Sequence, residues 1–255
     1  MAIPEVPVYA LFSGGKDSFA TAKFLQGQGL LKGCVMIDTG IAVPEWKATC
    51  LAMCKQQGWD AVIVPTPVRY EWIVWKYGFP GYQGHYFTMN YLKGRAIREW
   101  KKQYPGEALA SGVRQAESAR RSVTAKPLST FEGVQVYAPI YDWTTAQVWA
   151  YVRQHGYERP RAYSTLQISG DCLCGAFASE WEREALAIHH PEMAARICAM
   201  GKDRHGKEWG WCNKKAQKGP EEQLICAECG DTEVQLGAKS KNEAKTEANN
   251  RKKIK

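Results

Sequence analysis

Residues 13–18 bring together the glycines, hydroxyls and positive charge that a phosphate-binding loop requires. In order, they are Ser13, Gly14, Gly15, Lys16, Asp17 and Ser18. Two adjacent glycines allow the backbone to turn tightly and to approach a ligand closely. If a helix begins just after them, its first N–H groups are unpaired and carry a partial positive charge that suits an anion. The pattern predicts phosphate binding, and the simpler alternative is a glycine turn before a capped helix.

The side chains of this loop are of two kinds. Lys16 adds a full positive charge, and the hydroxyls of Ser13 and Ser18 can donate to phosphate oxygens. Asp17 would repel a phosphate unless Mg²⁺ bridges the two groups or the carboxylate caps the helix. The Walker A spacing of glycine, lysine and hydroxyl is absent, so the sequence predicts a different kind of phosphate loop.

Two later segments carry polar residues directly after apolar runs. Asp38, Thr39 and Gly40 follow the first run, and Asp38 offers a second carboxylate that could position Mg²⁺. The other segment contains Gly112, Arg114, Glu117, Arg120 and Arg121. Its guanidinium groups could hold phosphate or sulfate through paired hydrogen bonds, and Glu117 could orient one of them. An exposed arginine-rich helix is the alternative for this segment taken alone.

Five of the six cysteines in the C-terminal third lie in glycine-containing surroundings. They are Cys172, Cys174, Cys212, Cys226 and Cys229. Four thiolates suffice for a tetrahedral Zn²⁺ site or for an iron–sulfur cluster. The Cys-x-Cys spacing is unusual for structural zinc, so the pattern favours an iron–sulfur cluster over zinc. The alternative is a set of reduced, buried thiols, because free cysteine packs as a small apolar residue.

The elements that must position these residues follow from the apolar pattern. We expect strands at residues 6–12, 33–38, 61–64, 108–111 and 134–139, and helices at 18–28, 44–57, 70–77, 91–103 and 144–155. Strands joined by helices indicate a Rossmann-like α/β fold, whose mostly parallel sheet is covered by helices. Ligands of such sheets bind beyond the carboxyl ends of the strands, where the motifs above fall.

Composition predicts a globular chain with a distinct C-terminal end. The chain has 255 residues, 45% of them hydrophobic, which is enough for a sizeable core. We expect a nucleotide-binding domain over residues 1–170, a cysteine-rich region over 171–237 and a basic, disordered tail over 238–255. The tail holds seven Lys/Arg and two Glu, which is +5 of the net +8. Such a tail can raise affinity for nucleic acid, and it can equally serve solubility.

The sequence also predicts a cellular compartment. No apolar run approaches the roughly 18 residues that span a bilayer, and residues 1–5 lack the features of a signal peptide. We therefore expect a cytoplasmic protein without membrane contact. Its cysteines should be thiols or metal ligands rather than disulfides.

Four segments resemble the phosphoadenosine phosphosulfate (PAPS) reductase family of the PP-loop superfamily. Residues 13–18 match its Ser-Gly-Gly-x-Asp-Ser loop, and residues 37–40 with Pro44-Glu45 resemble its Asp-Thr-Gly … Pro-Glu segment. Residues 112–121 resemble Gly-x-Arg-x-x-Glu-Ser-x-x-Arg, and residues 139–143 resemble a structural Pro-Ile-x-Asp-Trp element. The resemblance implies a PP-loop fold that binds an adenine nucleotide, either ATP or the sulfated nucleotides PAPS and adenylylsulfate (APS), with Mg²⁺.

The C-terminal end departs from the reductase pattern. The reductases carry their catalytic cysteine in Glu-Cys-Gly-Leu-His, whereas Glu228-Cys229-Gly230 is followed here by Asp231-Thr232. Cluster-bearing relatives also have a Cys-Cys pair upstream, and no cysteine precedes residues 125–128 in this way. In this respect the chain is more similar to the sulfur-transfer branch, such as the PP-loop subunit of DNA phosphorothioation.

Three hypotheses follow. In the first, Mg-ATP is cleaved between its α and β phosphates and the adenylylated substrate accepts sulfur. The catalytic residues would be Lys16, Asp17, Asp38 and Arg114. In the second, Cys229 attacks the sulfur of PAPS or APS and sulfite leaves. In the third, the chain senses nucleotide or binds nucleic acid without turnover. The implied partners are an adenine nucleotide, a sulfur or electron donor protein and, as one open choice of acceptor, nucleic acid; the reductase relatives are commonly homodimers.

Overall fold

The computed structural model describes residues 2–81, 85–203 and 205–209. All of these residues belong to one compact unit. Cys212, Cys226, Cys229 and the basic tail lie outside the described residues.

Six strands form one sheet. They are β1 (Val8–Leu11), β2 (Leu31–Asp38), β3 (Ala61–Pro65), β4 (Leu109–Ala110), β5 (Leu128–Phe131) and β6 (Val134–Tyr137). Their order across the sheet is β3-β2-β1-β4-β6-β5, and every neighbouring pair is parallel except β5 with β6. In register, Tyr9 of β1 lies opposite Gly33 of β2 and Leu109 of β4. The structure confirms the expected α/β fold with a mostly parallel sheet.

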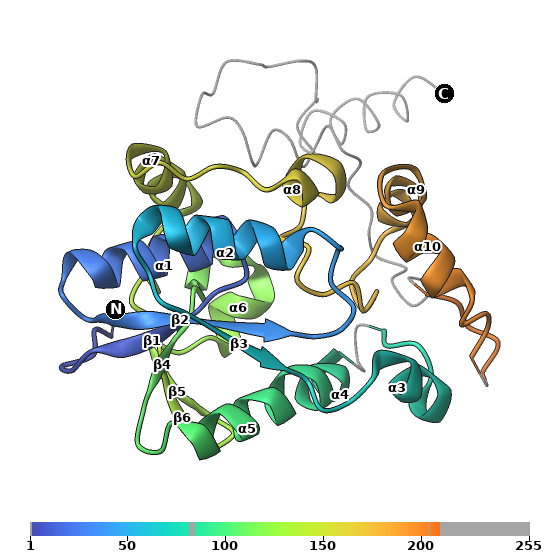
Figure 1. Ribbon diagram of the computed structural model, residues 1–255, viewed down its shortest axis with the longest axis horizontal. Coiled ribbons are helices and arrows are strands. Elements are labelled where there is room, and N and C mark those ends of the chain that lie inside the picture. The colour runs from blue at the N-terminus through green and yellow to red at the C-terminus, as the bar shows by residue number, and fades with distance from the viewer. Residues whose placement is uncertain (1, 82–84, 204, 210–255) are drawn as a thin grey trace, which may run out of the picture. The chain divides into compact units, whose positions relative to one another are not determined.

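Helices cover both faces of this sheet. They are α1 (Lys16–Gly27), α2 (Trp46–Gln57), α3 (Tyr70–Tyr77), α4 (His85–Met89), the π-helix η1 (Asn90–Gly94), α5 (Arg95–Gln103), the 3₁₀ turn η2 (Gln115–Glu117), α6 (Ala119–Thr124), α7 (Thr145–Gln154), α8 (Arg161–Leu166), α9 (Glu180–His189) and α10 (Pro191–Cys198). Figure 1 shows α1, α2 and α7 on one side of the sheet and α5 on the other. Within the described part of the chain, no helix is long and apolar enough to span a bilayer.

One buried core cluster lies between α5 and the sheet. Ala96, Ile97 and Trp100 form one helical stripe and are 0% exposed. They belong to one buried cluster with Val35 of β2 and Leu109 of β4. Because each large apolar side chain contributes about 1.5–3 kcal/mol when fully buried, this stripe fixes α5 against the strands and leaves their carboxyl ends as a rigid base for a site.

The strand order reverses direction at β1. The chain passes from β1 outward to β2 and β3 and then returns to β4 on the other side of β1. Doubly wound sheets bind ligands in the crevice at such a point. The loop after β4 packs directly on the start of α1, because a Cβ added to Gly112 would lie only 2.7 Å from the backbone carbon of Asp17. Glycine at position 112 thus permits the two loops of the crevice to touch.

Several parts of the fold go beyond the sequence prediction, among them the short helices α4 and α8. The edge strand β5 was not expected; it joins β6 through Glu132 and Gly133, whose φ angles of 53° and 72° suit a tight hairpin turn. After residue 170, where the apolar pattern predicted no elements, α9 and α10 form. Ser179 caps α9 by accepting the N–H of Glu182, and Pro191 occupies the first turn of α10.

Candidate functional site

Side chains from distant elements hold the backbone carbonyls of the loop that follows β1. Trp46 Nε1 donates to the Ser13 carbonyl at 2.8 Å, and the Tyr157 hydroxyl donates to the Gly14 carbonyl at 3.0 Å. Gly14 has a φ of +81°, and a Cβ there would lie 2.7 Å from Cys50 Sγ. Both the conformation and the space therefore require glycine at position 14.

The two serines of the loop close it from within. Ser18 Oγ donates to the Gly15 carbonyl at 2.8 Å and accepts the Ser13 N–H at 3.3 Å. The helix α1 begins at Lys16, so the first N–H groups at the loop have no partner within the helix. A loop held in this way before a helix start has the geometry that suits an anion.

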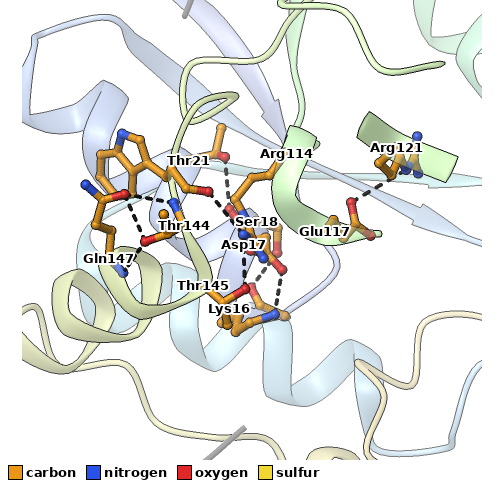
Figure 2. A network of polar contacts seen from close by, with 12 residues as sticks. Lys16, Asp17, Ser18, Thr21, Arg114, Glu117, Arg121, Thr144, Thr145 and Gln147 are labelled. Atoms are coloured by element: carbon orange, nitrogen blue, oxygen red, sulfur yellow. Dashed lines mark hydrogen bonds and ion pairs between the residues drawn. The ribbon is translucent and has the colours of Figure 1, made fainter. Parts of the chain in front are cut away.

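Asp17 lies between two cations, as Figure 2 shows. Arg114 Nε donates to Asp17 Oδ1 at 2.6 Å, and Lys16 Nζ donates to Asp17 Oδ2 at 2.8 Å. The Arg114 side chain is 2% exposed and also donates to the Trp143 carbonyl at 3.2 Å. A buried guanidinium needs a carboxylate partner. The contacts account for an acidic residue in a phosphate loop, because Asp17 neutralises Arg114.

Lys16 keeps its charge in this setting. Burial alone would lower the pKa of Lys16, but the interactions with Tyr163 and Asp17 outweigh burial and raise that pKa. The ammonium group also lies 5.9 Å from the centre of the Trp149 ring. Lys16 is thus held as a fixed cation at the start of α1.

A cavity of about 540 Å³ opens beside the loop. This volume is in the range of nucleotide and cofactor sites. Its lining includes the apolar residues Leu11, Phe12, Val35, Ile37 and Trp46. It also includes the positively charged residues Lys16, Lys93 and Arg121. A lining that combines apolar and cationic side chains suits a ligand that carries both a flat base and phosphates.

The structure divides the residues expected at the site into those that line the cavity and those that lie behind its lining. The cavity is lined by Ser13, Gly15, Lys16, Asp17, Ser18, Gly112, Glu117 and Arg121. Gly14 and Arg114 support this lining from behind, and Glu117 Oε2 lies 3.5 Å from Arg121 Nε. The side chain of Arg120, in α6, lies outside the described part of the chain.

The segment after β2 does not line this cavity. Asp38 Oδ2 lies 2.6 Å from Lys47 Nζ, and Asp38 Oδ1 accepts the Gly40 N–H at 3.1 Å. Burial would raise the pKa of Asp38, but these two hydrogen bonds outweigh burial and lower that pKa. The buried Thr39 hydroxyl donates to the Asp171 carbonyl at 2.8 Å. This segment therefore positions the loop that carries the first two clustered cysteines.

A second cavity of about 580 Å³ adjoins the first. The two share the residues Lys93, Glu117, Arg121, Ile168, Ser169 and Asp171 in their linings. Beyond this shared strip the second cavity is lined by Cys172, Cys174 and Glu182. The structure thus places the Cys-x-Cys pair next to the phosphate loop, although more than 150 residues separate them in sequence.

The pKa values of the two thiols depend on each other, because the thiols share a hydrogen bond. A hydrogen bond from Cys172 lowers the pKa of Cys174, and the same bond, together with burial, raises the pKa of Cys172. The Ala176 N–H and the charge of Lys93 lower the pKa of Cys174 further. Cys174 is therefore the thiol that loses its proton first, and the thiolate is the reactive form of cysteine.

Backbone contacts fix the cysteine loop in place. The Tyr70 hydroxyl donates to the Cys174 carbonyl at 2.7 Å, and Trp209 Nε1 donates to the Leu173 carbonyl at 2.6 Å. The Leu173 N–H donates to the Ile41 carbonyl at 2.7 Å. These bonds come from three distant parts of the chain, so tertiary structure rather than local sequence holds the pair.

An ion pair stands where the two cavities meet. Lys93 Nζ donates to Asp171 Oδ2 at 2.6 Å, and Ser169 Oγ donates to Asp171 Oδ1 at 2.6 Å. Burial would raise the pKa of Asp171, but the charge of Lys93 and these hydrogen bonds outweigh burial and lower it. In contrast, burial raises the pKa of Glu182 to about 7, and within the described residues no ion pair forms with Glu182.

The thiols at the second cavity supply only part of a metal site. Among the described residues, no group of three or more Cys, His, Asp or Glu side chains is placed to hold a metal ion. Cys172 and Cys174 would give two thiolates, which is half of a four-thiolate set. The other expected ligands, Cys212, Cys226 and Cys229, lie outside the described residues.

Several residues of the site were not found by sequence reasoning. They are Trp46, Lys93, Tyr163, Ser169 and Asp171. Ser169 and Asp171 lie directly before Cys172, so their position beside a candidate site was a usable signal. Lys93 offered no such signal, because only the packing of η1 turns it toward the cavities.

The fold and this site define an α/β protein of the PP-loop type, with a phosphate loop at the switch point of a mostly parallel sheet. The model of the phosphoadenosine phosphosulfate reductase domain matches residues 7–165, which is more than half of the chain. The chain therefore belongs to the phosphoadenosine phosphosulfate reductase domain family.

Solved structures with similar folds include two enzymes. The PAPS reductase of Candida auris, solved as a phosphate complex, is 15% identical with a TM-score of 0.46 over 64% of this chain and 78% of that one. The FMN adenylyltransferase of Candida glabrata, solved with FMN and the ATP analogue AMPCPP, is 12% identical with a TM-score of 0.40 over 57% of this chain and 46% of that one. No curated protein matches this chain in sequence.

Proposed function

We propose that the chain binds Mg-ATP in the first cavity, cleaves it between the α and β phosphates, and couples the adenylylation to sulfur transfer at Cys172 and Cys174. The observation that carries this proposal is the shared lining of the two cavities. A cysteine pair with one acidic thiol lies beside a phosphate loop that holds a fixed cation.

The first step would use the loop to stabilise charge. An oxygen of the acceptor attacks the α-phosphorus and forms a new P–O bond, while the bond to the β-phosphate breaks and pyrophosphate leaves. Lys16 and the first N–H groups of α1 would bind the negative charge that grows on pyrophosphate. Fixed donors of this kind need no reorganisation during the reaction, which is why they are effective.

Arg114 and Asp17 would act as positioning residues, because their charges are directed at each other rather than into the cavity. Asp17, Asp38 and Asp171 are each paired with a lysine or an arginine. Mg²⁺ would then enter as part of the nucleotide substrate, with phosphate and water as its main ligands, which is the usual arrangement for this ion.

The second step would use the thiols. A sulfur nucleophile displaces AMP from the activated acceptor, so that a C–S or P–S bond forms as the bond to AMP breaks. As free thiols, the pair would carry sulfane sulfur: Cys174, the more acidic thiol, would take it from a donor persulfide by exchange, and its terminal sulfur would displace AMP. Cys172 would then attack the resulting disulfide, which releases the thiolated acceptor and leaves a Cys172–Cys174 disulfide for the donor protein's thiols to reduce. If the pair instead holds an iron–sulfur cluster with two of Cys212, Cys226 and Cys229, Cys174 would act only as a ligand, and the cluster would supply a binding site for hydrosulfide.

The reductase reaction of the family would use Cys229, which lies outside the described residues, and no feature of the described site favours it. Calorimetric titration of anaerobically purified protein with Mg-ATP, APS and PAPS tests the proposal. We expect tighter binding of Mg-ATP. Tighter binding of APS or PAPS would overturn the proposal in favour of a sulfonucleotide reductase. Iron and acid-labile sulfide would be measured on the same sample, and their absence would remove the cluster.

A further inference from the structure

An exposed group of aromatic rings lies on α3, α4 and η1, away from the phosphate loop. We call it the aromatic platform and define it as Trp72, Trp75, Tyr77, Phe87 and Tyr91. Trp75 is 75% exposed, Phe87 39% and Trp72 37%. Large apolar side chains gathered at the surface of one region mark an interaction site.

Four of the five rings, all but that of Trp75, contact one another as a continuous surface. Phe87 lies 4.4 Å from Tyr77 and 4.7 Å from Tyr91, measured between ring centres. Trp72 lies 5.9 Å from both tyrosines, whose hydroxyls are 2.9 Å apart. Trp75 is one helical turn after Trp72 on the same face of α3. The side chains support each other, so the platform is preformed rather than assembled by a partner.

Two cations are placed over these rings. Lys76 Nζ lies 4.8 Å from the centre of the Trp72 ring and 5.2 Å from that of Tyr77. Arg95 lies 4.4 Å from the centre of the Tyr91 ring. Within the described residues neither cation forms an ion pair, whereas Arg69 at the start of α3, which is 86% exposed, lies 3.9 Å from Glu71 in one. The platform therefore offers flat apolar faces with uncompensated positive charge among them.

We infer that the aromatic platform binds an unpaired nucleic acid strand. Sequence-tolerant single-strand sites combine aromatic rings, on which bases stack, with Lys and Arg side chains that follow the phosphates. Lysine is depleted at the centre of protein–protein interfaces, so Lys76 between Trp72 and Tyr77 argues against a protein partner. A duplex would not fit equally well, because its bases are already stacked on one another.

The platform is connected to the cysteine-lined cavity through η1. Tyr91 belongs to the platform, and Lys93, two residues later in the same π-helix, lines both cavities. π-Helical turns are rare and are often found at functional sites. A strand on the platform would thus lie near the second cavity and could present the sulfur acceptor to Cys174. This last step rests on the proposed function, whereas the binding itself does not.

Fluorescence anisotropy of the full chain with a labelled single strand of about 20 thymidines, and with a duplex of the same length, tests the inference. No nucleotide is added, so the result is independent of ATP binding. We expect the double variant Trp75→Ala/Lys76→Ala to bind the single strand about 10- to 100-fold more weakly. The Arg95→Gln variant should bind more weakly as well, with a smaller dependence of affinity on salt concentration.

The matched control is Ile188→Ala/Lys102→Ala. It also removes one exposed apolar residue and one exposed lysine, on α9 and α5, outside the platform. We expect it to change affinity less than twofold. Since the basic tail is present in all variants, the difference between the two double variants measures the platform alone.

Three results would overturn the inference. They are absence of single-strand binding, equal effects of the two double variants, and equal affinity for duplex and single strand. Sedimentation velocity adds a fourth, because a dimer that dissociates in the Trp75→Ala variant would show that the platform is covered by a second copy of the chain.

Discussion

The two adjoining cavities differ in how their charges are balanced. At the phosphate loop every carboxylate has a cation: Asp17 is paired with Arg114 and Lys16, and Asp171 with Lys93. At the far end of the second cavity, Glu182 has no ion-pair partner among the described residues, and burial raises its pKa to about 7. The first cavity holds its charges fixed, whereas the second contains a carboxyl group with a pKa near neutral pH and a thiol, Cys174, with a lowered pKa.

This difference matches the chemistry that each cavity would perform. Binding and cleaving a phosphate anhydride requires donors and cations that stay in place while charge moves on the substrate. Thiol chemistry requires a side chain that changes its protonation state. The strip that the two cavities share carries the ion pair between Lys93 and Asp171. Both members of this pair stay charged where the two cavities meet.

Loss of the buried ion pair at the loop should have the largest effect. Replacing Asp17 by Asn leaves the Arg114 guanidinium, 2% exposed, without its carboxylate. We expect a loss of about 3–5 kcal/mol in the free energy of unfolding, the usual result of breaking a buried pair on one side. Chemical denaturation followed by tryptophan fluorescence would measure it.

Asp38→Asn is the control for that variant. Its ion pair with Lys47 is at the surface, where the lysine is 49% exposed. We expect a change of about 0–1 kcal/mol. Equal losses of unfolding free energy in the two aspartate variants would show that the Asp17–Arg114 pair stabilises the protein no more than a surface ion pair does.

Removal of the Lys16 charge should have the next largest effect, on binding rather than on stability. We expect Lys16→Ala to weaken Mg-ATP binding about 10- to 100-fold, since a charge-assisted contact to phosphate is lost. Lys23→Ala is the control, because Lys23 lies on the same helix but bonds to Gln26 and Gln57 instead. Calorimetry on both variants would decide, and an unchanged affinity in Lys16→Ala would exclude this lysine as a phosphate ligand.

The Glu182 carboxyl should make stability depend on pH. Its pKa in the folded state, about 7, lies above the ordinary value of 4.5, so the folded chain binds the proton more tightly than the unfolded chain does. The contribution of Glu182 to the free energy of unfolding is therefore largest below about pH 4.5, and it decreases as the pH rises through 7. The full shift would correspond to roughly 3 kcal/mol. Because the Glu182 side chain is only partly buried and solvent screens it, we expect Glu182→Gln to remove a decrease of about 1–2 kcal/mol over this interval.

The exposed Glu180 on the same helix provides the control for this titration, since Glu180→Gln should leave the pH profile unchanged. Denaturation curves collected at several pH values would compare the three proteins. A wild-type profile that coincides with that of Glu182→Gln would show that the second cavity does not raise the pKa of this carboxyl.

The phosphate loop could be predicted because its determinants are local. An apolar strand, two glycines and a helix start occur within a dozen residues, and Ser18 acts through neighbours in the loop. The partner of Asp17 could not be predicted in the same way. Arg114 was recognised as an anion ligand by type, but only the return of the chain to β4 places it behind the loop, where it pairs with the carboxylate.

The second cavity was less predictable because its parts come from separate elements. The Cys172–Cys174 motif was visible in the sequence, yet its position depends on Tyr70, Ile41 and Trp209. Lys93 shows the same limit, since nothing in its neighbourhood distinguishes it from a surface lysine. Caps such as Ser179 and the Glu132-Gly133 turn were local signals that a closer inspection of the sequence would have recovered.

The smallest expected effect is on nucleotide affinity, and it tests most directly whether the two cavities are separate sites. Cys174 lines the second cavity but not the first, so Cys174→Ser should change the dissociation constant of Mg-ATP by less than about twofold. Sulfur transfer should be lost in the same variant, because a serine hydroxyl cannot carry sulfur. Cys198→Ser, at an exposed cysteine outside both cavities, should retain both properties. If calorimetry showed Cys174→Ser to weaken nucleotide binding as much as Lys16→Ala does, the two cavities would form one site, and the division of labour between fixed charges and titrating thiols would be wrong.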